Sequence, residues 1–340
     1  MTKLIRYAVV ILLAAVIFAG YFYKKFIGGP AVPEGLDSYF IEIPTHSEFD
    51  KVLEILNTKG LVQNKEIFTR LAVKMNYKRS PMRSGRFEIS PGWNTIDLIR
   101  HLRNGKQSPV DVVINNARLT DEVAGKVARF IEPDSLTLKT LFSDPDYLRK
   151  INYSKETLMS LFIPNTYEFY WDTTPEQFMD RMIKEHDNFW SKKNRLKKAK
   201  ALEMTPAEVY TLASILERET QQKSEKKRMA GVYLNRLEKG IRLQADPTAV
   251  FATRDFDTKR VLNYHINFDS PYNTYIYAGL PPGPISMASI ESIDAVLNAE
   301  QHDYIFFCAR GDGSGLHNFA KTLEAHNRNV QIYKKNLGYR

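Results

Sequence analysis

The stretch TPAEVYTLASILERET, Thr205 to Thr220, carries the strongest structural signal in the chain. Thr205, Pro206 and Glu208 form a capping box with proline at the first helical position, which predicts the start of a helix. The apolar residues that follow have the spacing of one buried helix face; they are Val209, Leu212, Ala213 and Leu216. We therefore expect an α+β fold that is rich in helices around this segment.

Two glutamates lie at the end of this predicted helix. Each residue turns a helix by about 100°, so Glu217 and Glu219 point roughly 200° apart, toward opposite edges of the apolar stripe. A catalytic pair made from these two carboxylates alone is therefore excluded. A glutamate at such an edge loses hydration, which raises its pKa and suits it to act as a general acid on a glycosidic bond. The alternative, a solvated face at a charged helix end, stays open from this segment alone.

The N-terminal segment YAVVILLAAVIFAGYFY, Tyr7 to Tyr23, has no charged residue and has basic residues on both sides. A bilayer span takes about 17 to 20 apolar residues, so this segment is long enough. A cleaved signal peptide is the alternative, but a cut after Ala19 would place the large Ile17 where a small residue is needed. We expect residues 1–27 to be a short cytoplasmic tail and an uncleaved single-pass anchor in the cytoplasmic membrane, with the bulk of the chain outside the cytoplasm.

Two further regions follow the anchor. Residues 28–37 are rich in Gly and Pro and indicate a linker. In residues 38–115, strand patterns (SYFIEIP, GRFEIS, VDVVIN) alternate with helix patterns (SEFDKVLEILNTKG, NKEIFTRLAVKMNY, NTIDLIRHLRNG), which predicts a small α+β domain. Helix patterns dominate residues 116–340, the second predicted domain, with strands expected near QADPTAVFA and YIFFCAR.

Composition narrows the classes of partner. The formal net charge of +9 favours nucleic acid, anionic lipid or an anionic polymer. The basic run KKNRLKKAK, Lys192 to Lys200, is either a clamp for a polyanion or a solvated helix face. The predicted anchor and the lack of a recognisable nucleic-acid-binding motif argue against nucleic acid. The single cysteine, Cys308, excludes an internal disulfide, and no HExxH motif is present, so no metal or other cofactor is expected.

Three later stretches combine Gly or Pro with Asn, Gln and Tyr. They are LNRLEKGIRLQADPTAVFA (234–252), SPYNTYIYAGLPPGPIS (270–286) and ARGDGSGLHNFAKTLEAHNRNV (309–330). Amides that bond hydroxyls and rings that cover sugar faces are typical of a carbohydrate groove, although each stretch alone also suits an ordered surface loop. Together with LASILERET they closely resemble the endolytic murein transglycosylase family. In addition, SGRFEISPGWNTIDLIRHLRNGKQ resembles that family's small LysM-like domain, and LFIPNTYEFYW (161–171) resembles its phenylalanine-proline-aspartate-threonine-tyrosine motif.

The resemblance implies a membrane-anchored lytic transglycosylase. Such an enzyme cuts the β-1,4 bond between N-acetylmuramic acid and N-acetylglucosamine inside peptidoglycan strands, here expected to be nascent strands, and leaves a 1,6-anhydromuramic end. By the same resemblance Glu217 is the catalytic residue: it protonates the leaving oxygen and then takes the proton of the muramic 6-hydroxyl. The expected partners are glycan strands, membrane lipid and wall-synthesis enzymes, and not nucleic acid. The predicted substrate-binding residues are Asn165, Glu219, Gln244, Asp246, Thr248, Tyr272, Asn273, Thr274 and Tyr275.

Three positions depart from the family pattern. Asn165 replaces an aspartate, Met287 to Ser289 (MAS) replaces asparagine-proline-glycine, and Leu316 replaces a glycine where a positive φ is expected. None of them is Glu217. The main alternative function is a non-catalytic, membrane-tethered peptidoglycan-binding or scaffold protein, which would not need Glu217 as a proton donor.

Overall fold

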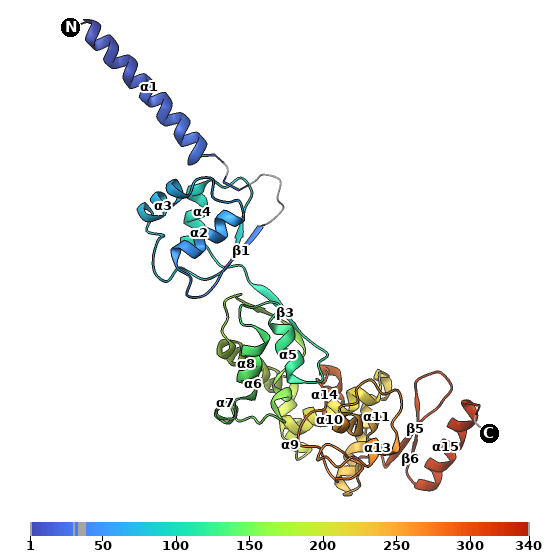
Figure 1. The fold of residues 1–340 in the computed structure, drawn as a ribbon. Coiled ribbons are helices and arrows are strands. Elements are labelled where there is room, and N and C mark those ends of the chain that lie inside the picture. The colour runs from blue at the N-terminus through green and yellow to red at the C-terminus, as the bar shows by residue number, and fades with distance from the viewer. Residues whose placement is uncertain (1, 30, 33–38, 339–340) are drawn as a thin grey trace. The chain divides into compact units, whose positions relative to one another are not determined.

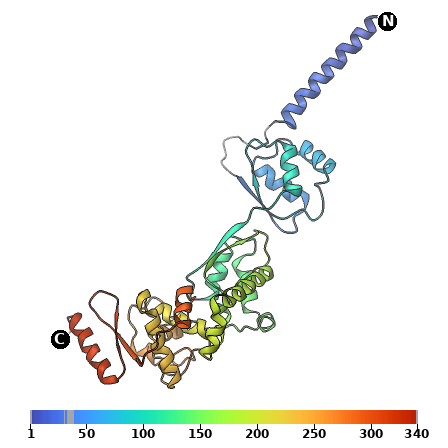
Figure 2. The same cartoon turned by 180° about the vertical axis from the view of Figure 1, so that it is seen from behind.

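The structure is a computed structural model that describes residues 2–29, 31–32 and 39–338 (Figures 1 and 2). By its internal contacts the chain divides into two compact units. The first comprises Met1–Asp111, Phe130–Pro133 and Glu168–Thr174, and the second comprises Val112–Arg129, Asp134–Tyr167 and Pro175–Arg340. Both units mix helices with short two-stranded sheets, so the expected α+β class with many helices is confirmed.

Helix α1 (Thr2–Phe26) contains the predicted anchor. Within it, Ile5–Lys24 is a 20-residue segment with a mean hydropathy of 2.2, long and apolar enough to cross a membrane. It is the one helix of the described residues that meets this criterion. Most of the expected linker, residues 30 and 33–37, lies outside the described residues. Ala31 and Val32, in contrast, donate backbone hydrogen bonds to the carbonyl of Trp93 at 2.7 and 3.1 Å, and both side chains are buried.

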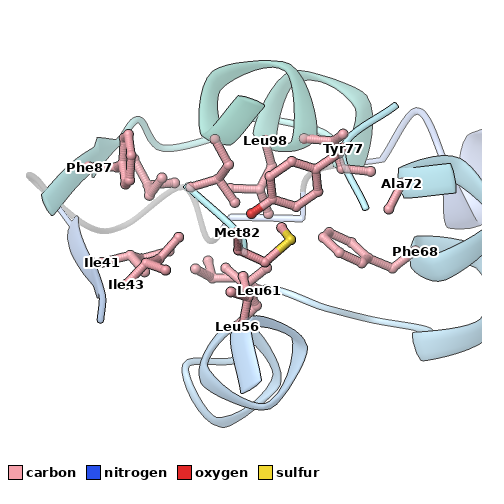
Figure 3. Packing of buried hydrophobic residues seen from close by; sticks show 14 of the residues in the cluster. Ile41, Ile43, Leu56, Leu61, Phe68, Ala72, Tyr77, Met82, Phe87 and Leu98 are labelled. Carbon is pink, nitrogen blue, oxygen red and sulfur yellow. The ribbon is translucent and has the colours of Figure 1, made fainter. Parts of the chain in front are cut away.

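The rest of the first unit is the small α+β module that the alternating patterns predict. Its elements are β1 (Tyr39–Ile43), α2 (Phe49–Thr58), α3 (Lys65–Lys74), β2 (Gly85–Ile89) and α4 (Thr95–Asn104). Strands β1 and β2 are antiparallel, with Ile41 opposite Phe87. Both strands alternate between buried and outward residues, as a sheet with one covered face requires. Figure 3 shows Ile41, Ile43 and Phe87 from the strands packed in one interior with helix residues such as Leu56 and Leu98.

Strand β3 (Val110–Ile114) has a partner that the sequence does not indicate. It was expected to complete the small module, but it pairs with β4 (Asn165–Phe169) and not with β1 or β2. The alternation of buried Val112 and Ile114 with outward neighbours predicts a strand, and nothing in such a pattern specifies which other segment supplies the hydrogen bonds. The expected boundary at residue 115 therefore lies just beyond a strand that is bonded to a distant part of the chain.

The second unit is mostly helical. Its helices are α5 (Thr120–Val127), α6 (Ser135–Ser143), α7 (Pro145–Lys150), η1 (Leu158–Leu161), α8 (Pro175–Ser191), η2 (Lys192–Asn194), α9 (Arg195–Ala201), α10 (Pro206–Glu219), α11 (Lys223–Glu238), α12 (Asp246–Thr253), α13 (Asn263–Ile266), α14 (Ile290–Leu297) and α15 (Leu323–Asn336). Helix α10 packs against α14, α11 and α12. Strands β5 (Phe306–Ala309) and β6 (His317–Ala320) are antiparallel and lie beside α15 (Figures 1 and 2).

Of the two strands expected in this unit, one is confirmed and one is wrong. YIFFCAR contains β5. QADPTAVFA instead forms α12, which begins at Asp246 with Pro247 in its first turn. Proline fits the first turn of a helix because the amide hydrogen that it lacks has no helical partner there, and an acidic residue at that end is favoured by the helix dipole. These two residues were the available signal for a helix.

Candidate active site

Helix α10 begins as its sequence predicts. The Thr205 hydroxyl accepts the amide hydrogen of Glu208 at 3.2 Å, and the Glu208 carboxylate accepts the amide hydrogen of Thr205 at 2.8 Å, which completes the capping box. The side chains from Val209 to Leu216 are all buried. Glu217 is the first residue after this buried stretch, so the helix carries its carboxylate to the edge of the core.

The two glutamates open onto different cavities, as the helical geometry predicts. Glu217 lines a cavity of about 350 Å³ together with Arg218, Ser289 and the other lining residues Asn115, Asn116, Pro164, Gln221 and Met287. Glu219 lines a separate cavity of about 570 Å³ with Asp246. Arg218, between them in sequence, lines both. Among the described residues, Glu217 is thus the one carboxylate that lines this cavity.

One face of α10 positions the chain segment that touches Glu217. Tyr210, Ser214 and Glu217 lie four and three residues apart and therefore share a face. The Tyr210 hydroxyl accepts the amide hydrogen of Ala288 at 3.2 Å, and the Ser214 hydroxyl accepts that of Ile285 at 3.0 Å. These bonds fix the backbone of residues 285–288 along the helix, so the next residue, Ser289, comes to lie against Glu217.

Three side chains bind the Glu217 carboxylate. Ser289 and Ser292 donate their hydroxyl hydrogens to its Oε2 atom at 2.5 Å, and the Lys226 Nζ atom lies 3.1 Å from the same oxygen. Lys226 also donates to the Ser292 hydroxyl at 2.8 Å, and its side chain is only 5% exposed. Ser289 is in addition the N-cap of α14, where it accepts the amide hydrogen of Ser292. The carboxylate is therefore held by a cation and two hydroxyls that are themselves fixed.

These contacts reverse the direction expected for the pKa shift of Glu217. Burial raises the pKa of Glu217, but the hydrogen bonds from Ser289 and Ser292 and the ammonium of Lys226 together outweigh burial, so the pKa is lowered from its ordinary value. The raised pKa expected for a glutamate at this edge is therefore not found at Glu217 in the protein without substrate. Helical periodicity predicts that Glu217 is partly removed from water. It does not predict which side chains from distant segments bind its carboxylate in place of water.

Glu219 has the raised pKa that was expected at the edge of the stripe. Burial raises the pKa of Glu219 to about 7, and the hydrogen bond from the Tyr233 hydroxyl, 2.7 Å from Oε1, only partly offsets it; the nearby charge of Asp246 acts in the same direction as burial. Near neutral pH this group is therefore divided between its acid and its carboxylate forms.

Three of the predicted substrate-binding side chains are fully buried. The Asn273 amide donates to the carbonyls of His265, Ile266 and Phe268, and the hydroxyls of Thr248 and Thr274 are 2.8 Å apart. In this conformation a sugar has no access to these side chains. Their hydrogen bonds hold the loop after α13 against α12.

Of the predicted side chains that remain, Asp246 lines the larger cavity, and the others are outside the lining of both cavities. Asp246 is exposed and accepts a hydrogen bond from Tyr275 at 2.5 Å, and Tyr272 packs against Phe251, which lines the larger cavity. The other two are also exposed. Gln244 accepts a hydrogen bond from Arg236 at 3.4 Å, and Asn165 follows Pro164, which lines the Glu217 cavity. The structure thus places Asp246 and Tyr275 beside Glu219 and not beside Glu217.

Sequence reasoning missed the groups that bind Glu217. Lys226 stands in the charged stretch KSEKKR, where nothing distinguishes it from Lys223 or Lys227. Ser289 belongs to the MAS departure, and its place just before the apolar pattern of α14 was an available N-cap signal. The Leu316 departure causes no strain, because the positive φ angles of this loop fall on Gly311, Gly313 and Gly315. The described residues contain no group of three or more His, Cys, Asp or Glu that could hold a metal ion.

Comparison with known proteins relates most of the chain to a known family. Residues 41–332 match the YceG-like family. A Bacillus subtilis protein named endolytic murein transglycosylase is 26% identical over 336 residues, which cover 94% of this chain and 91% of the relative. A Streptococcus pneumoniae protein of the same name is 25% identical, covering 94% of this chain and 63% of the relative. A crystal structure of a yceG-like protein from Listeria monocytogenes is similar with a TM-score of 0.57 and 28% identity, over 86% of this chain and 98% of that one.

Proposed function

The chain belongs to the YceG-like family, and from that premise we propose that it is an endolytic murein transglycosylase, a lytic transglycosylase that cuts peptidoglycan glycan strands internally. The bond cut is the β-1,4 bond between N-acetylmuramic acid and N-acetylglucosamine. The observation that carries the proposal is Glu217, a carboxylate without a second acid in the lining of its cavity. Inverting hydrolysis needs a second carboxylate to activate water, whereas an internal attack by the sugar itself does not.

Glu217 serves both proton transfers in this mechanism. As the acid it donates its proton to the glycosidic oxygen while the bond to the muramic anomeric carbon breaks. As the carboxylate it then removes the proton of the muramic 6-hydroxyl, whose oxygen closes onto the anomeric carbon and forms the 1,6-anhydro ring. At the end Glu217 again carries a proton, as it did at the start, and no water is consumed.

In the protein without substrate, the lowered pKa of Glu217 favours the carboxylate, which is the form that the second step needs. A glycan that fills the cavity would remove the remaining water around the carboxylate, which acts to raise the pKa toward the acid form that the first step needs. Lys226, Ser289 and Ser292 would stabilise the carboxylate that the first step leaves. We assign these three as positioning residues for Glu217.

Mass spectrometry of digested glycan strands tests the proposal. Purified full-length protein in mild detergent should release products that end in 1,6-anhydromuramic acid, and Glu217→Gln should release none. Reducing muramic ends from the wild type would show hydrolysis and would refute the lyase mechanism. Binding of glycan without cleavage by either protein would support the alternative of a peptidoglycan-binding or scaffold protein.

The finer organisation is also proposed. We infer that residues 38–115 act as a LysM-like module, supported by the compact core of that unit, and that the nascent strand is the substrate. Hydrogen-exchange protection of residues 39–104 when strands are added to full-length Glu217→Gln would support the module, and unchanged exchange would exclude it.

We infer that α1 anchors the chain in the cytoplasmic membrane with the N-terminus inside. The basic residues that flank this helix favour contact with anionic lipid. The anchor would also hold the site close to wall-synthesis enzymes. Digestion of the chain by protease added outside spheroplasts is expected, and full protection would refute this orientation.

A further inference from the structure

We propose that the cavity on the Glu219 side of α10 binds the carboxylates of the peptide that muramic acid carries. The inference rests on the proposed function, because it assigns a second part of the same substrate to a second part of the same unit. None of the substrate-binding predictions from sequence included the basic residues of this cavity.

The cavity has the size and lining of a ligand site. Its volume of about 570 Å³ lies within the usual range of roughly 300 to 1,000 Å³ for small-molecule pockets. Apolar side chains form part of the wall, among them Val250, Phe251 and Phe256. Four basic side chains from three segments also line it; they are Arg118, Arg218, Lys259 and Arg260.

Arg218, which belongs to α10, and Arg118 are available to a ligand. Arg218 is partly buried, and within the described part of the chain its guanidinium makes no hydrogen bond and no ion pair. Arg118 lies over the ring of Phe256, 4.6 Å from its centroid, and among the residues that the structure describes its guanidinium has no hydrogen-bond or ion-pair partner. Burial and the charge of Arg118 lower the pKa of Arg218, and the charges of Glu217 and Glu122 offset this only in part, so repulsion between the two guanidiniums remains. A carboxylate between them would relieve that repulsion and accept paired hydrogen bonds.

The acids of the cavity do not neutralise these arginines. The Glu219 carboxyl is bonded to Tyr233 at 2.7 Å, and the Asp246 carboxylate to Tyr275 at 2.5 Å. Within the described residues neither acid forms an ion pair with a basic side chain. They would suit an amino group on the same peptide, so a ligand with both carboxylates and an amine matches the lining.

The position of the cavity agrees with the chemistry of the substrate. The sugar whose anomeric carbon reacts is the muramic acid, and this same sugar carries the peptide. Arg218 follows Glu217 directly and lines both cavities. A muramic acid at Glu217 can therefore direct its peptide past Arg218 toward Arg118.

A second basic cavity is less suited to an anion. Lys193, Lys198, Lys223, Lys226 and Lys227 line it, with a volume of about 300 Å³. Lys226 is bonded to Glu217, Lys223 is paired with Glu291 at 3.3 Å, and Lys198 donates to Asn298. Most of these charges are already occupied by protein groups, so the Glu219-side cavity is the stronger site.

Binding measurements on a non-cleaving protein test the proposal. Full-length Glu217→Gln in detergent is titrated by calorimetry with a disaccharide that carries the stem peptide and with the same disaccharide after removal of the peptide by an amidase. We expect the peptide-bearing ligand to bind about tenfold more tightly, the least that charge-assisted hydrogen bonds usually contribute. Adding Arg118→Gln, or Lys259→Gln with Arg260→Gln on the exposed loop, should bring this ratio close to one.

The control is Arg149→Gln, an exposed arginine of the same unit that is not part of the cavity lining and should retain the ratio. Unchanged preference in both cavity variants, or no preference in the parent protein, would overturn the proposal. Thermal unfolding of each variant identifies misfolding, and the loop variant provides a second test if Arg118→Gln does not fold. Cleavage by the wild type is measured separately, so loss of the subsite and loss of the proposed activity are distinguishable.

Discussion

Glu219→Gln should stabilise the protein above neutral pH. The variant keeps an acceptor for the Tyr233 hydroxyl but cannot ionise, whereas the wild-type pKa is raised from 4.5 to about 7 by burial. Between these two values the unfolded chain has lost the Glu219 proton and the folded chain retains it, so wild-type stability falls as the pH rises. At about 1.36 kcal/mol per pH unit the loss is roughly 3.4 kcal/mol. Because the side chain is partly exposed and solvent screens its charge, we expect about 2 kcal/mol.

Thermal unfolding at several pH values measures this effect. For a unit of this size 1 kcal/mol corresponds to about 2 to 4 °C, so the variant should unfold about 4 to 8 °C above the wild type at pH 8. The advantage should become small toward pH 4.5, where the folded wild type holds the proton and the unfolded chain holds it about half of the time. Glu238→Gln, on the exposed surface of α11, is the matched control and should show no such trend. A difference between Glu219→Gln and the wild type that stays constant from pH 4.5 to pH 8 would refute the reasoning.

Three further changes have defined outcomes. Lys226→Met removes the cation beside Glu217, which raises the pKa of the carboxyl that must be protonated for the first step, so the alkaline limb of the pH–rate profile for glycan cleavage should move to higher pH; an unmoved limb would contradict the assigned role. Ser214→Ala leaves the buried amide of Ile285 without its acceptor and should cost about 1 to 3 kcal/mol in urea unfolding, against little change for the exposed Ser191→Ala. Gly85→Ala should destabilise the first unit by about 1 to 3 kcal/mol, because φ is +122° and the added methyl would overlap Gln107; an unchanged urea midpoint would refute it.

Local signals predicted the elements around the site well. The capping box at Thr205 and the apolar period after it were enough to define α10, and the opposed directions of Glu217 and Glu219 followed from helix geometry alone. The strands and helices of the small module were recognisable because alternation, helical spacing and stop signals such as Gly60 all act within a few residues.

Groups that meet across long stretches of chain were not predictable. Lys226 and Ser289 contact Glu217 from different parts of the chain. Together with Ser292, they lower the pKa of Glu217, which burial alone would raise. Strand β3 finds its partner more than fifty residues later, in β4. In each case the local sequence pattern predicts the helix or strand itself. It does not predict which distant segment of the chain packs or pairs with it.

The attachment of residues 285–288 to α10 has a consequence for how this loop can vary between relatives. Tyr210 and Ser214 bind main-chain amides, which every residue except proline possesses. Side chains in this stretch can therefore be exchanged during divergence without moving the loop, provided that they fit the space and leave those amides in place. Ser289 is different, because its own hydroxyl contacts Glu217. Substitutions at positions 285 to 288 that fit this buried space should leave the loop in place, whereas one at 289 would alter the chemistry of the carboxylate.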